Sequence, residues 1–470
     1  NPAGHDHHHH HHHGDHSPST QPVAFEITGV VVDTSEQPVG EAMVLQGGRP
    51  ETTVLTQEDG TFTMMFEPPS QGMSSIVAAK AGYRASGNDN VTQDQPIKIK
   101  IQRIEGPDNE EYIYQDPGDG IDDMKEDCTH CHKSFVSQFL SSKHASATKG
   151  PLLQDLYAGV SRAYTNQADC LSAGGQWREG KEPGTDGSAL MKCYLGGGVL
   201  PDLNETCGGP EQLSCDSLHL STQAQPTNFG SCADCHAPGI NGKAGGRNLH
   251  DATGLAFEKG VHCDTCHKVR DVDLSLPPGV GNRLVMGRPS EQGRTFFDWD
   301  PVFYGPLPDV PTPIMGGSYQ PKFNQSLFCA GCHEQNQQAL LPNQQLDETR
   351  WPDGLPIHTT YSEWKDGPYN TEKTPCQHCH MPSTYGRINA VEGATLDNQS
   401  STHGFVRAPD DIRQHTFLGP LMGDPRLIDD ALYVSVKTNL ESDQLHATIS
   451  ITNIGCGHAV PTGEPMRALI

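Results

Sequence analysis

The segment Cys-Thr-His-Cys-His at residues 128–132 sets the pattern that decides the fold, because four later segments repeat it. They read CADCH at 232–236, CDTCH at 263–267, CAGCH at 329–333 and CQHCH at 376–380. A shuffled chain of this composition should contain roughly 0.03 such strings, so five of them are not accidental. The motifs use ten of the 15 cysteines in the 470-residue chain.

Each motif has the arrangement that attaches one haem covalently. Two thiols separated by two residues bond to the two vinyl groups of a haem, and the next imidazole then binds the iron. We therefore expect five covalent haem c groups as cofactors. The predicted attachment residues are Cys128, Cys131, Cys232, Cys235, Cys263, Cys266, Cys329, Cys332, Cys376 and Cys379. The predicted proximal iron ligands are His132, His236, His267, His333 and His380.

Structural zinc is the alternative for a Cys-x-x-Cys pair. Zinc sites join two such pairs and do not require a histidine directly after each one, whereas all five motifs have that histidine. Haem also fits the composition. With 34% hydrophobic residues, 50 glycines and 36 prolines, the chain has little apolar material for a core, and five flat apolar cofactors would supply it.

The sixth ligand of each iron is expected to be a second histidine. Apart from the proximal positions and the first 16 residues, 11 of the 25 histidines remain, and no methionine-rich segment competes with them. The predicted distal ligands are His144, His219, His250, His415 and His458, with His262, His358 and His403 in reserve. For each of these, a solvated or hydrogen-bonding histidine is the alternative.

The charge balance excludes some partners. Lys and Arg number 32 against 58 Asp and Glu, which gives a net charge of −26 that repels nucleic acids and anionic membranes. No window approaches the roughly 18 apolar residues of a transmembrane helix. With no initiator Met or apolar leader at Asn1, we expect a mature exported protein, extracellular or on the cell surface, with the periplasm as the alternative.

The chain begins with two segments of different character. Residues 1–21 are histidine-rich and are expected to be disordered; they are either a native metal-binding tail or an expression tag. Residues 22–104 alternate apolar and polar residues in short runs, which predicts a small antiparallel β-sandwich. The order GVVVD, PVGEAMV, TQEDGTF and AKAGY resembles the carboxypeptidase regulatory-like, transthyretin-like domain. That resemblance implies a non-catalytic module.

The remaining segments complete a multidomain fold. Residues 105–125 are expected to be an acidic linker, and residues 126–425 a pentahaem cytochrome c domain of short helices and loops with little regular structure. Its insertion, 161–216, carries four cysteines, for which we favour the disulfides Cys170–Cys193 and Cys207–Cys215. Residues 426–470 are expected to form a β ribbon with a distal histidine. Cys456 is left over, as a buried thiol or a bridge to another subunit.

Four strings carry a second resemblance: LFCAGCHEQN, TTYSEWKDGPY with TPCQHCHMP, HTFLG and NIGCGHAVPTG. They resemble exported multihaem c-type cytochromes of metal- and mineral-respiring prokaryotes, some of which polymerise into extracellular filaments. The resemblance implies that His415 and His458 are distal iron ligands. Cys456 departs from it, since relatives often have alanine there.

Together these features predict an electron-transfer protein rather than an enzyme, with no catalytic residues. The expected form is a homopolymeric extracellular cytochrome filament, or nanowire, whose partners are other copies of itself and redox proteins or extracellular acceptors. The alternatives are a monomeric periplasmic electron shuttle and a pentahaem reductase of nitrite or a similar oxyanion. The reductase would need one open iron, which such enzymes mark with lysine in place of the motif histidine, and all five motifs have histidine. A third possibility is an adhesive or metal-binding surface component.

Overall fold

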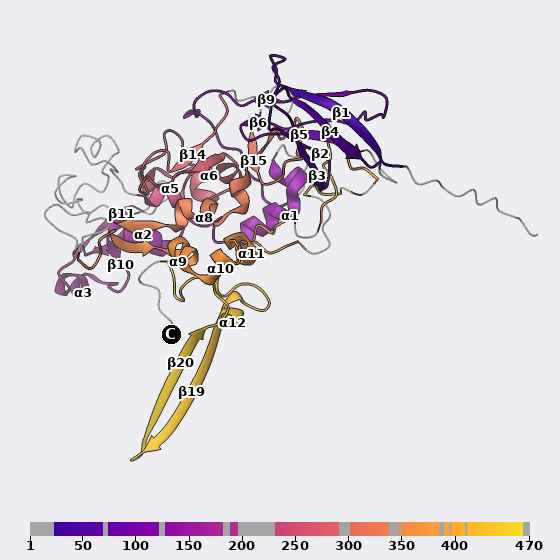
Figure 1. The fold of residues 1–470 in the computed structure, drawn as a ribbon. Helices are drawn as coiled ribbons and strands as arrows, with labels where there is room; N and C mark the ends of the chain where they lie inside the picture. The colour runs from indigo at the N-terminus through magenta and orange to yellow at the C-terminus, as the bar shows by residue number, and fades with distance from the viewer. Residues whose placement is uncertain are drawn as a thin grey trace, which may run out of the picture.

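The computed structural model describes most of the chain in three parts (Figure 1): an N-terminal β-sandwich, a central region that carries the motifs, and a C-terminal hairpin. The described residues are 23–68, 74–121, 127–181, 189–195, 231–290, 301–337, 347, 349–384, 390–393, 395, 397–408 and 411–463. The histidine-rich tail, His219 and the Cys207–Cys215 pair lie outside them. Within the described residues, no helix is long and apolar enough to cross a membrane.

The β-sandwich forms because short alternating runs place their apolar residues on one face, as in β4, where every second residue is buried. Its strands are β1 (Phe25–Val32), β2 (Met43–Gln46), β3 (Arg49–Leu55), β4 (Thr61–Phe66), β5 (Ile76–Ala79), β6 (Tyr83–Arg84), β7 (Ser86–Asn88), β8 (Ile97–Lys100) and β9 (Gln102–Arg103). They form sheets of order β4-β1-β8 and β3-β2-β5-β7, with β6 paired to β9. The predicted β-rich N-terminal part is therefore present.

One pairing departs from the purely antiparallel prediction. β1 runs antiparallel to β4 but parallel to β8. The reason is that the chain crosses to the second sheet through β5 and β7 before it returns beside β1. Val31, Ile76 and Ile101 are fully buried between the sheets, so the apolar alternation still defines the core.

The stretch 105–121 is not the solvated acidic linker that its composition predicts. Tyr112 and Tyr114 are buried against the apolar residues Val269, Val272 and Met286. The Asp108 carboxylate also forms an ion pair of 2.5 Å with the buried Arg288. Two tyrosines among the acidic residues thus anchor this stretch in the core of the motif region.

A buried interface joins the sandwich to the motif region. Asp309 and Arg407 form a buried ion pair, and the Asp309 carboxylate accepts the backbone N–H of Gly48 at 2.7 Å. Beside them Phe405 packs on Leu45 and Val77, although it lies more than 300 residues further along the chain. The two parts are therefore held together by apolar packing and by charge.

The motif region places each motif on a short helix. These helices are α1 (Cys128–Ser141), α5 (Cys232–His236), α7 (Cys263–Cys266), α8 (Ser326–His333) and α11 (Cys376–His380). The other helices are α2 (Pro151–Ala158), α3 (Gln167–Ser172), α6 (Gly254–Glu258), α9 (Thr360–Asp366), α10 (Pro368–Thr371) and α12 (Leu427–Ala431), with 3-10 turns η1 (Leu249–Asp251) and η2 (Pro321–Asn324). Three small sheets pair β13 (Val269–Val272) with β14 (Leu284–Met286), β15 (Phe303–Gly305) with β16 (Gly317–Tyr319), and β17 (Gln335–Gln337) with β18 (Leu355–His358). Short helices and loops dominate, as predicted.

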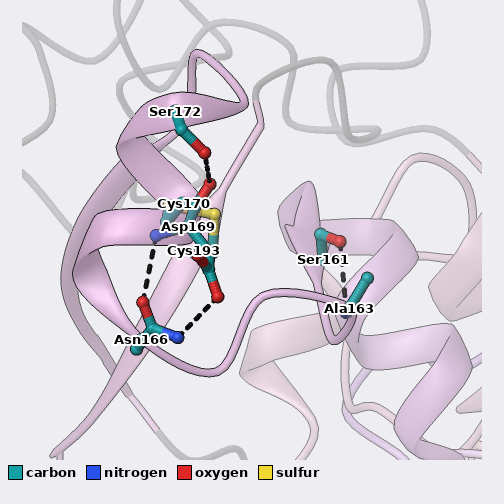
Figure 2. The surroundings of a disulfide bond; sticks show 7 residues. All are labelled: Ser161, Ala163, Asn166, Asp169, Cys170, Ser172 and Cys193. Atoms are coloured by element: carbon teal, nitrogen blue, oxygen red, sulfur yellow. Dashed lines mark hydrogen bonds between the residues drawn. A yellow bond between two sulfur atoms is a disulfide. The ribbon is translucent and has the colours of Figure 1, made fainter.

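The cysteine-rich insertion is held by the predicted disulfide Cys170–Cys193, which Figure 2 shows. The bond joins α3 to β12 (Ala189–Tyr194), the middle strand of a sheet with β10 (Val160–Ser161) and β11 (Gln176–Lys181). The Asn166 side chain caps α3 by accepting the backbone N–H of Asp169. This local prediction is confirmed.

The predicted C-terminal ribbon is a long hairpin of β19 (Leu432–Glu441) and β20 (Gln444–Asn453) that projects away from the rest of the molecule (Figure 1). Val434 pairs with Ile451 and Val436 with Ile449, so the apolar side chains share one face. Exposure of the large apolar side chains on this face ranges from 46% to 70%. Within the described residues, the hairpin has an apolar face that nothing covers.

Candidate functional site

The fold brings the motif cysteines together in pairs from different motifs. The thiol of Cys128 forms a hydrogen bond with Cys263, which together with burial raises the pKa of Cys128 well above its ordinary value. Hydrogen bonds likewise join Cys235 to Cys332 and Cys329 to Cys376. The first motif is thus adjacent to the third, the second to the fourth and the fourth to the fifth.

Three motif histidines each face a second histidine. Ring centres lie 6.2 Å apart for His144 and His333, 6.5 Å for His267 and His415, and 6.2 Å for His380 and His458. Two imidazoles that bind one metal from opposite sides, each at about 2.0 Å, have centres roughly 6.3 Å apart. The spacing therefore fits one iron between the rings of each pair.

Hydrogen bonds fix the orientation of many of these rings. The Nδ1–H groups donate to backbone carbonyls: His132 to Ala390 at 3.1 Å, His267 to Tyr304 at 2.7 Å, His380 to Leu418 at 2.6 Å, His415 to Arg413 at 3.1 Å and His458 to Ala459 at 2.9 Å. A ring that donates from Nδ1 keeps its lone pair on Nε2, the atom that binds a metal. This is the tautomer that iron ligation requires.

Burial lowers the pKa of five of the six paired rings, whereas hydrogen bonds to Cys456 and to the Ala459 carbonyl outweigh burial at His458 and raise its pKa. Burial lowers the pKa of His144 to about 4 and the pKa of both His333 and His415 to about 3. A metal binds only the unprotonated imidazole. The Nδ1 atom of His144 is buried without a hydrogen-bond partner. The five rings with a lowered pKa are therefore ready to accept a metal at neutral pH.

At the second motif, His358 acts on the ring of the motif histidine His236. Burial, together with the smaller effect of the charge of His358, lowers the pKa of His236 to about 4. His250, a predicted distal ligand, packs its ring edge against Tyr157 at 5.0 Å. His358, a reserve candidate, lies at the end of β18, opposite Gln335 of β17. No sequence spacing shows that pairing.

Two other reserve histidines have different surroundings. His262 is fully buried, both of its ring nitrogens lack a hydrogen-bond partner, and its Nε2 lies so close to Gly239 that a Cβ added there would be 2.6 Å away. His403 lies beside the Ser400 hydroxyl at 3.1 Å. Cys456 is a free thiol whose sulfur is 3.3 Å from Nδ1 of His458. The described residues include no group of three or more His, Cys, Asp or Glu side chains placed to hold a bare metal ion.

Comparison with known proteins indicates the class of protein to which the chain is similar. Residues 210–268, which contain the second and third motifs, match the family described as cytochrome c554 and c-prime. The match indicates a c-type cytochrome, a class in which haem is bound covalently and transfers electrons. It covers a small part of the chain. No curated protein matches.

The similar solved structures, with TM-scores of 0.14, do not support an assignment of fold or function. Two mutants of a type II cohesin–X-dockerin complex from Acetivibrio cellulolyticus match with 16% identity and a TM-score of 0.14, over 17% of this chain and 58% of theirs. A membrane-associated protein of unknown function from Bacteroides fragilis NCTC 9343 matches with the same identity and TM-score, over 36% of this chain and 55% of its own. The matches therefore span little more than half the length of those proteins.

Proposed function

We propose that the protein is an electron carrier outside the cytoplasm, with five covalent haems that each have two histidine ligands. The observation that carries the proposal is the set of three histidine pairs at 6.2–6.5 Å, each with one motif histidine. When bound, each haem iron would accept and release one electron. The ten motif cysteines named above would hold the haems.

From these histidine pairs we propose a ligand pair for three of the sites. His144 serves the fourth site with His333, and His415 serves the third with His267. His458 serves the fifth with His380. For the second site we propose His358 with His236; the charge of His358 acts on the rings of both His236 and His333. His219 and His250 remain predictions as ligands.

The contacts between motifs support a relay. The Cys128–Cys263, Cys235–Cys332 and Cys329–Cys376 contacts link the five motifs in two groups, the first with the third and the second with the fourth and fifth. The charge of Cys266 also acts on Cys329, which links the third motif to the fourth. All five sites are thus connected, with the fourth linked to the second, third and fifth, and a relay for electrons requires such a connection.

Carbon monoxide separates a carrier from an oxyanion reductase. Protein imidazoles on both sides of each iron leave no position for a substrate, whereas a reductase needs one open iron. We expect the fully reduced protein to show no shift of its Soret band when carbon monoxide is added. Binding by about a fifth of the haem would instead support the reductase.

We further propose that the chain assembles with copies of itself into an extracellular filament. The hairpin supports this, since its apolar face and both of its strand edges lack partners within the described residues. A sheet edge pairs readily with another chain, and a head-to-tail contact that does not close forms a filament. The proposed partner is a second copy of the chain, which would cover the exposed apolar face.

Analytical ultracentrifugation of natively prepared protein at micromolar concentration tests this assembly. We expect species much larger than the 50.9 kDa chain with its haems. Val436→Lys should dissolve them because Val436 lies on the apolar face, whereas the matched change Thr452→Lys on the polar face, opposite Tyr433, should not. A single species of monomer mass across the concentration range would favour the monomeric shuttle.

A further inference from the structure

An ion pair is buried completely inside the third motif. Asp264 lies between the two cysteines of α7, and Lys268 follows His267 directly. Both side chains are 0% exposed, and Lys268 Nζ is 2.5 Å from Asp264 Oδ1. The spacing of four residues brings the two charges onto the same side of the helical turn.

The surroundings satisfy both charges. Asp264 Oδ2 accepts a hydrogen bond of 2.9 Å from the Tyr112 hydroxyl and one of 2.8 Å from the backbone N–H of Gln115. Lys268 Nζ lies 3.6 Å from the ring centre of Phe303, a cation–π contact. The pair is therefore built into the core by residues from three separate segments.

Stability alone does not explain a pair of this kind. Two charges lose their hydration when they are buried, and an apolar pair of similar volume often stabilises a fold equally well. Both charges also act on the thiol of Cys128 in the first motif. They therefore lie where two haem sites meet, and a fixed charge in a low-dielectric interior acts strongly on its neighbours.

We propose that Asp264 and Lys268 are positioning residues that set the reduction potential of the haem at the third motif. This proposal rests on the proposed electron-carrier function. The ammonium group disfavours the more positive oxidised iron and so raises the potential, whereas the carboxylate lowers it. Because both groups are held in place, their opposite effects partly cancel, and the potential of this haem lies between the values that each charge alone would give.

Single substitutions should move one potential in opposite directions. In a potentiometric titration of the full haem-loaded chain followed by EPR, Lys268→Met should lower one of the five potentials and Asp264→Asn should raise one. The double variant should return close to the parent value, and Lys268→Arg, which keeps the charge, should stay close to it. Arg426→Met removes one charge of an exposed ion pair with Asp429 and should move none.

The outcomes separate this proposal from the function on which it rests. Absence of haem from the parent peptide that contains Cys263 and Cys266, as seen by mass spectrometry, would overturn the haem assignment itself. If the haem is present and both single variants leave all five potentials unchanged, or move them in one direction, the charge proposal is wrong. Should the single variants not fold, a double variant with a clearly shifted potential would also overturn it.

Discussion

A variant with Cys263→Ala and Cys266→Ala should carry about four haems instead of five, because haem cannot attach without the thiols. The loss should extend beyond its own site. Cys128 of the first motif contacts Cys263, and an unfilled haem space removes apolar core that both sites share. We expect a lower melting temperature and partial loss of haem from the first motif, measured by haem content and by mass spectrometry of the motif peptides.

The disulfide provides a matched control for that variant. Cys170→Ala with Cys193→Ala also removes two cysteines, but these bridge the insertion and belong to no motif. This control should keep about five haems even if the insertion is destabilised. An unchanged haem content in the first variant, or an equal loss in the control, would contradict the assignment of the third motif.

Replacing His144 by alanine should convert one low-spin iron to high spin. His144 lies just beyond α1, and its ring faces that of His333 at 6.2 Å, so its removal opens the sixth position of the fourth site. We expect a high-spin EPR signal and carbon monoxide binding by about a fifth of the haem. His446→Ala changes an exposed residue of β20 and should alter neither. Spectra of the His144 variant identical to the parent would show that His144 is not a ligand.

The attachment motifs are readable from sequence because their chemistry is local. Two thiols and an imidazole within five residues occupy one helical turn, and no distant contact is needed to recognise them. His144 also follows from local sequence, since it ends the helical pattern after the first motif. The effect of His358 on the His236 ring is not readable, because the position of His358 depends on its strand pairing with Gln335.

The same holds for the fold: features set by neighbouring residues can be predicted, and contacts between distant segments cannot. Alternation predicts the strands of the sandwich, and loop length favours the disulfide between Cys170 and Cys193. The burial of Tyr112 and the ion pair of Asp309 with Arg407 depend instead on segments that lie far apart in sequence. An acidic composition could not show that residues 105–121 pack into the core, because the two tyrosines among them determine that packing.

The haem content per chain tests the central claim most directly. The claim is that all five motifs hold a covalent haem and that the histidine pairs form around these cofactors. The purified protein is extracted with acidic acetone to remove any haem that is not covalently bound, and the pyridine haemochrome is measured against the protein concentration. The account predicts about five haems per chain. A value of four or fewer would mean that at least one motif is unused and would contradict it.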